Sequence, residues 1–448
     1  MVTKQKDNLT DALLLQPIIA ARGSFYYLAM ALLGFTAFAF IAWIAQLRSG
    51  LGVTGLNVPV YWGVYITNFV FFIGISHAGT LISAILRLCH AEWRRSITRA
   101  AEVITVLVLF FGVGSIIMDL GRPDRALNVL KHPNLRSPLL WDVCSITVYL
   151  TASTIYLYLP LIPDIALLRD FGGKFSWFYR VLALGWKGTA RQVRILHRAI
   201  AVMAVIVIPI AVSVHTVVSW VFAMTVQPMW HSAIFGPYFV VGAIFSGIAA
   251  IIIAMALIRR IYYLHDYLKP VHFNHLGLLL LVMTLLWFYF TFAEYLTTFY
   301  GGEPSHLSIF YSKLTGRFAP AFWAMVIACF AIPFPILAWR RTRTITGTVV
   351  ASISVNIGMW LERYTIVVPT MSHPRLPWAE GAYSATWVEI AITLGFGATF
   401  IFLYMLFTRF FPIISIWEIQ EGREQSLPEV VARVQSYMPS DATVPAEG

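Results

Sequence analysis

Ten long apolar stretches constrain this chain more than any other feature of its sequence. Each has about 18 residues or more, enough to cross a hydrocarbon core of roughly 30 Å as one helix. A chain that is 59% hydrophobic and 12% charged has more apolar surface than a soluble domain needs. The sequence therefore predicts an all-α, polytopic membrane protein. The ten predicted spans lie near 24–46, 60–88, 101–118, 138–162, 199–222, 235–258, 276–299, 319–339, 346–369 and 385–408.

The distribution of lysine and arginine predicts the orientation of the chain. With the N-terminus inside, the inner loops hold 17 of these residues and the outer loops hold 8. Cytoplasmic loops carry the excess of positive charge, so both termini are expected in the cytoplasm. This bias also accounts for the net charge of +11, which then gives no indication of nucleic-acid binding. The segment 1–23 lacks a small-residue cleavage site, so it is expected to stay cytoplasmic rather than act as a secretory signal.

A faint internal duplication suggests how the spans are grouped. Gly63 and Tyr65 open one span, and Gly236 and Tyr238 open another at the same spacing. The spacing favours two four-helix bundles with flanking helices, the first over 60–222 and the second over 235–369, within a membrane domain over 24–410. A cytoplasmic tail is expected over 411–448. The longest inner loop, 163–198, could hold one interfacial helix with a basic face.

Ionisable residues inside the predicted spans are the strongest indication of function, because a charge in lipid costs between about 2.5 and 10 kcal/mol or more. Asp119 ends one span, and Asp142 lies near the start of the next. A short connection joins these two spans, so the two carboxyl groups should lie at similar levels on the outer side. His77 lies near the middle of its own span. Two acids that exchange protons beside an apolar molecule suit a hydroquinone, which loses two protons with two electrons. Asp119 could alternatively be an interfacial helix end beside Arg122.

A second set of ionisable residues lies in the outer halves of later spans. His215, Glu294, Glu362 and Arg363 could form either a structural network or a proton path. Glu362 and Arg363 are adjacent, about 100° apart around a helix, so each is expected to find its partner on another helix. Glu389 is close enough to the interface to be solvated.

No metal or haem site is predicted. Cys89, Cys144 and Cys329 are scattered without the spacing of a metal-binding motif, and they are expected to be packing residues. His77 and His90 are separated by 13 positions, but His197 and His215 are separated by 18. The two pairs differ by about 7.5 Å of helical rise and cannot hold the same two haems.

Several segments together resemble a known family. The match spans most of the chain: WGVYITNFVFFIGISHAGTLISAILRL (62–88), LGRP (120–123), SPLLWDV (137–143), LIPDIALLRD (161–170), GPYFVVGAIFSG (236–247) and NIGMWLERY (356–364). They resemble the NrfD/PsrC family, the polysulfide reductase-like, quinone-reactive membrane subunits of respiratory oxidoreductases. Within it, they look most similar to ActC of bacterial alternative complex III.

The resemblance implies a role in electron transport at the bacterial inner membrane. It implies a site for menaquinone or ubiquinone at the outer end of the first bundle, where Asp142 matches the family's quinol-site acid and His77 matches a polar residue. Asp119 stands where ActC-like members often have histidine, and Arg122 of the LGRP motif is expected in the same quinone site. The implied partners are a periplasmic, ferredoxin-like iron–sulfur subunit and membrane lipid. Molybdopterin-type or multihaem cytochrome subunits and a second NrfD-like subunit are further partners that it allows.

An alternative from another class stays open. In a proton-coupled secondary transporter, the acids of the outer half would couple protons to a solute. That function predicts broken helices at matching places in two halves of the chain. The candidates are Pro209 in one half and Pro333 with Pro335 in the other, which are not at equivalent positions.

Overall fold

A computed structural model describes residues 14–15, 18, 23–171, 175–373 and 381–422. It contains ten helices long and apolar enough to cross a membrane, which confirms the predicted all-α polytopic class. The spans are α2 (Gly23–Ser49), α3 (Val64–Leu88), α4 (Thr98–Asp119), α6 (Pro138–Asp170), α8 (Ala190–Ala223), α9 (Phe235–Ile261), α10 (Pro270–Gly301), Ala319–Ala338, α14 (Ile345–Ser372) and α15 (Trp387–Phe410). The short elements are η1 (Leu51–Val53), η2 (Glu92–Ser96), η3 (Pro123–Arg125), α5 (Asn128–Lys131), α7 (Ser176–Leu182) and α11 (Pro304–Leu314).

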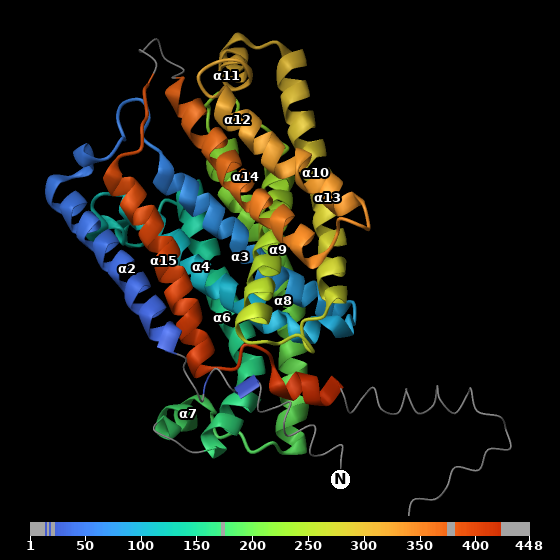
Figure 1. The fold of residues 1–448 in the computed structure, drawn as a ribbon. Helices are drawn as coiled ribbons and strands as arrows, with labels where there is room; N and C mark the ends of the chain where they lie inside the picture. Colours follow the sequence, from blue (N-terminus) through green and yellow to red (C-terminus); the bar gives the residue numbers. More distant parts are fainter. Residues whose placement is uncertain (1–13, 16–17, 19–22, 172–174, 374–380, 423–448) are drawn as a thin grey trace, which may run out of the picture.

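The spans pack in two groups. In the first group, α3 packs on α4, α4 on α6, α6 on α8 and α8 on α3, which closes a ring of four helices. In the second group, α9, α10, the span Ala319–Ala338 and α14 contact one another in the same way, and α9 also packs on α3. Helices α2 and α15 lie side by side, and α15 in turn contacts α4 and α3 (Figure 1). The domain limits expected from the sequence stay predictions.

The span Ala319–Ala338 is interrupted. It consists of α12 (Ala319–Val326), a π-helical turn η4 (Ile327–Ala331) and α13 (Pro333–Ala338). Pro333 lacks an amide hydrogen, so the regular ladder of hydrogen bonds cannot run through it. Pro209, in contrast, lies inside a continuous α8. These prolines therefore do not give the matched pair of broken helices that the transporter alternative predicts.

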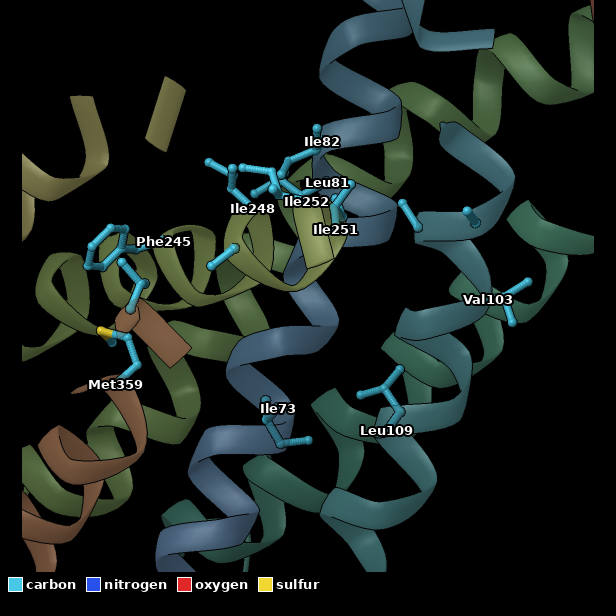
Figure 2. Packing of buried hydrophobic residues seen from close by; sticks show 14 of the residues in the cluster. Ile73, Leu81, Ile82, Val103, Leu109, Phe245, Ile248, Ile251, Ile252 and Met359 are labelled. Atoms are coloured by element: carbon cyan, nitrogen blue, oxygen red, sulfur yellow. The ribbon is translucent and has the colours of Figure 1, made fainter. Parts of the chain in front are cut away.

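A close approach between α3 and α4 anchors the first group. A side chain at Gly79 would overlap with the carbonyl oxygen of Ala101 and the hydroxyl of Thr105. Glycine is needed here because only a residue without Cβ lets the two backbones come so close. Next to this crossing along α3, aliphatic side chains of α3 pack on those of α9, as Leu81 and Ile252 illustrate in Figure 2.

Helices α6 and α8 extend beyond the predicted spans. They cover 138–170 and 190–223, so the predicted loop 163–198 is short. Thr189 and Gln192 form a reciprocal capping box that starts α8. Between the two helices lies α7, which has exposed Trp177 and Val181 beside Arg180. Its short length and apolar outer face are typical of a helix at a membrane interface.

The segment after α15 is packed, not free. Arg99 of α4 and Asp164 of α6 form a buried ion pair with a 2.5 Å N···O distance. Asp164 also accepts hydrogen bonds from the amides of Ile416 and Trp417, both at 3.1 Å. The predicted tail 411–448 is therefore attached to the helices as far as it is described, to residue 422. Its remainder, and most of the predicted segment 1–23, lie outside the described residues.

The two ends of the helices differ in their chemistry. We name them the Asp119 end, where α4 ends and α6 begins, and the Glu418 end, where α3 ends and α4 begins. The segment 412–422 and α7 lie at the Glu418 end, and α11 lies at the opposite end (Figure 1).

Candidate functional site

Asp119 is the last residue of α4, and its carboxyl group points into a polar cluster. Its Oδ1 is buried and has no hydrogen-bond partner. The carboxyl interacts electrostatically with Glu389 of α15. Tyr65 of α3 lies in the same cluster and donates to Gln46 of α2 at 2.6 Å, while Gln46 donates to the carbonyl of Met118 at 2.8 Å. Residues of three other helices, α2, α3 and α15, therefore lie in the cluster with this acid.

Asp142 lies in the second turn of α6, at the same end of the protein. Pro138 occupies the first helical position, where its missing amide hydrogen costs nothing. The Asp142 side chain is buried, with 4% of the residue exposed, and its Oδ1 has no hydrogen-bond partner. A buried acceptor of this kind costs free energy unless a donor such as water or a ligand hydroxyl reaches it.

The connection between α4 and α6 holds both acids at this end but does not join them. No hydrogen bond or ion pair links the Asp119 and Asp142 side chains in the described part of the chain. Gly121 turns the backbone with φ of +61°, a conformation that favours glycine. Arg122, predicted to reach a ligand, is exposed and forms an ion pair with Asp124 at 3.0 Å. The pair lowers the pKa of Asp124 and raises that of Arg122.

His77 is not beside the two acids. Its ring is fully buried between α3 and α8, and its Nδ1 and Nε2 lie 2.9 Å and 2.6 Å from the carbonyl oxygens of Ile73 and Ala211. Each nitrogen faces a carbonyl acceptor, and a neutral imidazole, with a single N–H, donates to one of the two carbonyls at a time. The ring contacts those of His215 and Tyr149, with centroids 4.5 Å and 5.2 Å apart. The structure therefore groups His77 with His215.

Glu362 and Arg363, each expected to find its partner on another helix, also contact each other. Arg363 Nη1 lies 2.9 Å from Glu362 Oε2, and both residues are almost completely buried. The long side chains bridge the 100° between adjacent positions. Glu362 also accepts from the indole of Trp287 in α10 at 2.7 Å. Arg363 lies over the ring of Phe239, 4.7 Å from its centroid.

Glu294 lies further toward the Asp119 end and is partnered by a residue that the sequence did not single out. It accepts from Ser232 at 2.7 Å and interacts electrostatically with Lys313 of α11. Lys313 is 4% exposed, and burial lowers its pKa to about 8 although Glu294 acts in the opposite direction. A cavity of about 20 Å³, lined by Glu294, Lys313 and Glu362, lies between them. It can hold one water molecule, which needs roughly 10–15 Å³.

Glu389 is buried, so the expectation that it would be solvated is wrong. Its side chain accepts from the hydroxyl of Tyr383 at 2.6 Å and from the amides of Gly55 and Thr386 at 2.7 Å and 2.9 Å. It closes a capping box at the start of α15, which fixes the loop 50–63 to that helix. The cysteines also differ from expectation, since Cys329 is buried but Cys89 and Cys144 are exposed.

Comparison with known proteins identifies the family to which the chain belongs. The fold and the buried titratable groups define an integral membrane protein, with ten candidate membrane-spanning helices among the residues that the structure describes. Residues 52–374 match the family described as polysulphide reductase, NrfD, and the chain belongs to that family. The family predicted from the sequence is thus confirmed.

Three relatives share most of their length with this chain. A protein of Halobacterium salinarum, described as a membrane subunit of dimethyl sulfoxide reductase, is 26% identical over 83% of this chain and 88% of its own. A selenate reductase subunit of Mesobacillus selenatarsenatis is 23% identical over 88% and 98%. The Hdr-like menaquinol oxidoreductase integral membrane subunit of Archaeoglobus fulgidus is 23% identical over 78% and 80%. All three are named as subunits of oxidoreductases.

Proposed function

We propose that this protein is the quinone-reactive membrane subunit of a respiratory oxidoreductase complex. One observation carries the proposal. At the Asp119 end, two acids from adjoining helices each present a buried carboxyl oxygen without a hydrogen-bond partner. The hydroxyl groups of a quinol are donors that would satisfy such acceptors. Membership of the NrfD family, and the names of the relatives, support the same function.

The chemistry follows from the groups present. Oxidation of a quinol to a quinone releases two electrons and two protons. Asp142 would accept one proton directly, because its carboxyl is buried and its Oδ1 is free. Asp119 would accept the other or pass it to water at the end of α4. The electrons would leave to a redox centre in a partner subunit. If the complex reduces quinone instead, both acids act as donors.

The location of the acids supports the placement of the partner. They lie at the Asp119 end, which the distribution of lysine and arginine predicts to face the periplasm of a bacterial inner membrane. A ferredoxin-like iron–sulfur subunit would dock there. The name of the Archaeoglobus relative favours menaquinone over ubiquinone. Membership of alternative complex III stays a prediction. The same holds for partner subunits of the molybdopterin, multihaem cytochrome or second NrfD-like type.

The test is quinol oxidation by the purified complex with an artificial electron acceptor. Asp142→Asn keeps the size of the side chain but cannot take up a proton, so we expect turnover to fall by about a hundredfold or more. Asp124→Asn is the matched control, because Asp124 is an exposed acid of the same connection. Its activity should equal that of the wild type. Normal turnover in a folded Asp142→Asn complex, or a wild-type complex that binds no quinone, would refute the proposal.

A further inference from the structure

We propose that this protein binds an anionic phospholipid by its headgroup, in a cavity at the Glu418 end between the end of α6 and the connection that leads into α8. The cavity has a volume of about 510 Å³, and its lining includes Arg169, Asp170, Phe171, Trp186, Lys187 and Gly188. Cavities of about 300–1,000 Å³ are typical of sites for small molecules. The cavity lies at the opposite end from Asp119 and Asp142, so the proposal does not depend on the quinone chemistry.

The two walls of the cavity are held together by hydrogen bonds. Arg169 Nη1 donates to the carbonyl of Trp186 at 2.9 Å, which joins the end of α6 to the connection. The amide of Lys187 donates to Oε1 of Gln192 at 3.0 Å, which fixes the connection to the first turn of α8. Gly188 has a φ of +70°, a conformation that favours glycine. The shape of the cavity is therefore set by the fold of these segments.

Lys187 is the cation of the lining that a bound anion would contact. It is exposed and forms no ion pair with any residue that the structure describes. Arg169 is the other cation, but its Nε and Nη2 donate to the Asp170 carboxylate at 2.7 Å and 3.0 Å. With one arginine, one lysine and one aspartate, the lining has one net positive charge. A phosphodiester has one negative charge and complements it.

The chain beside the cavity is strongly basic. From residue 175 to residue 198 the sequence has five lysine or arginine residues and no aspartate or glutamate. All five are exposed, and none forms an ion pair with a residue in the described part of the chain: Arg180, Lys187, Arg191, Arg194 and Arg198. Clusters of this kind next to membrane helices attract anionic lipid headgroups.

The depth of the cavity matches the headgroup layer. Helix α6 has 33 residues and starts at the Asp119 end. At about 1.5 Å per residue it is roughly 49 Å long, slightly more than the 40–45 Å of a bilayer with its headgroups. The last turns of α6, which line the cavity, therefore reach the headgroups of the opposite leaflet.

Helix α7 gives an independent estimate of the same depth. The hydroxyl of Tyr179 in α7 donates to the carbonyl of Phe410 at 3.0 Å, and Phe410 is the last residue of α15. Figure 1 shows α7 next to this end of α15. Because α15 is a candidate membrane span, its end marks the membrane interface. The cavity and α7 thus lie at one level.

Exposed apolar side chains favour a lipid over a soluble anion. Phe171, which lines the cavity, is 65% exposed, and Trp177 and Leu184 nearby in the chain are 74% and 68% exposed. A free phosphate ion would leave these side chains in water. A phospholipid brings acyl chains as well as a phosphate, and aromatic side chains are common at the membrane interface. The cations and the apolar side chains together therefore match an anionic phospholipid.

The predicted orientation agrees with this ligand. The distribution of lysine and arginine predicts that the Glu418 end faces the cytoplasm. The cytoplasmic leaflet has a negative surface potential, and basic pockets between membrane helices on that side bind anionic headgroups.

The experiment measures lipid binding to the whole complex, freed of lipid in detergent, by native mass spectrometry. The probes are dioleoyl phosphatidylglycerol, dioleoyl phosphatidylcholine and inorganic phosphate. We expect the wild type to bind phosphatidylglycerol more tightly than the other two. Lys187→Gln should weaken this binding about fivefold and Lys187→Glu about 25-fold, since each unit of charge at an anionic lipid surface has about the former effect. Binding of phosphatidylcholine should not change.

A substitution with the opposite effect sharpens the test. Asp170→Asn removes the carboxylate that pairs with Arg169, while Arg169 keeps its bond to the carbonyl of Trp186. Binding of phosphatidylglycerol should then become about fivefold tighter. Lys131→Gln is the matched control, because Lys131 is an exposed lysine at the Asp119 end. It should bind both lipids as the wild type does.

The possible outcomes are distinct. Equal affinity of the wild type and Lys187→Glu for phosphatidylglycerol would overturn the proposal, and so would an equal loss in Lys131→Gln. Inorganic phosphate that binds as tightly as phosphatidylglycerol would also overturn it, because the site would then serve a soluble anion. Lys187 and Asp170 are exposed, so these variants are expected to fold, and their thermal unfolding in detergent checks this. A complex that binds phosphatidylglycerol as expected but does not oxidise quinol would refute only the proposed function.

Discussion

The rings of His77 and His215 meet edge to face, with centroids 4.5 Å apart, and so join a residue of α3 to a residue of α8. The sequence placed one in the quinone site and the other in a proton path. The contact puts both in the interior of the first group, away from Asp119 and Asp142. Any role for His77 must therefore be considered together with His215.

The Arg99–Asp164 pair is expected to contribute strongly to stability. Both side chains are 2% exposed or less, and Arg99 also donates to the carbonyl of Pro160 at 2.8 Å. Removing one partner leaves a buried charge without compensation, which costs about 3–5 kcal/mol. Arg99→Gln should therefore lower the free energy of unfolding by about that amount, measured by denaturant titration in detergent micelles.

The exposed pair Arg122–Asp124 provides the control for this measurement. Its side chains are 63% and 59% exposed, and exposed pairs contribute about 0–1 kcal/mol. Arg122→Gln should leave unfolding almost unchanged. Equal effects of the two substitutions would show that the buried pair contributes no more to the free energy of unfolding than the exposed pair does.

The crossing of α3 and α4 should not tolerate even one methyl group at Gly79. Gly79→Ala would force the Cβ into the Ala101 carbonyl and the Thr105 hydroxyl, so the helices must separate. Overpacking of this kind costs about 1–3 kcal/mol or more. We expect a lower midpoint of thermal unfolding in detergent.

Gly74 lies on the same helix and gives a matched comparison. A Cβ there would lie 3.4 Å from the Ser246 hydroxyl, an ordinary contact. Gly74→Ala should be neutral or slightly stabilising, since alanine is the better helix former. If Gly79→Ala is equally well tolerated, the close approach described for α3 and α4 is wrong.

Glu418 should make stability depend on pH at the acid side. Burial acts to raise its pKa, but the attraction of Arg87 and Arg94 outweighs this effect and lowers the pKa below its ordinary value. The folded state then binds a proton less readily than the unfolded state. The stabilisation is complete above the unfolded pKa of about 4.3 and is lost as pH falls through the folded pKa.

The measurement compares the wild type with Glu418→Gln over a range of pH. The stability difference between them should be constant near pH 7 and should shrink as the pH falls below about 4.3. A difference that grows on acidification would contradict the assignment of Arg87 and Arg94 as its partners. Glu92→Gln, at an exposed acid near the same end, should show no comparable trend.

Much of the fold could be predicted from hydropathy alone, because lipid requires long apolar helices whatever the tertiary contacts are. All ten spans were found. The end of α6 was placed too early, because Asp164 and Arg169 resemble loop residues, and the start of α8 was placed too late. Asp164 is instead neutralised by Arg99, a partner more than 60 residues away that no local pattern indicates.

The site was harder to predict because its groups depend on contacts between distant segments. Lys313 was missed because it follows a span and resembles an ordinary loop cation. Glu389 looked solvated because depth along a helix does not reveal that the loop 50–63 covers it. In contrast, Asp119 and Asp142 were recognisable, since acids at the ends of apolar runs are rare.

The attachment of the segment 412–418 has a consequence for how the protein is made. Asp164 receives its two amide donors from residues more than 250 positions later, and Arg99 receives part of its coordination from Ser415, 316 positions later. The ribosome synthesises these residues after all ten of the described membrane-spanning helices. Arg99 and Asp164 therefore lack these hydrogen-bond partners while the earlier helices are inserted. They acquire them only after α15 and the segment that follows it have been synthesised. A chain that terminates before this segment would leave these buried polar groups without their partners, and its less stable fold would be a substrate for cellular proteases.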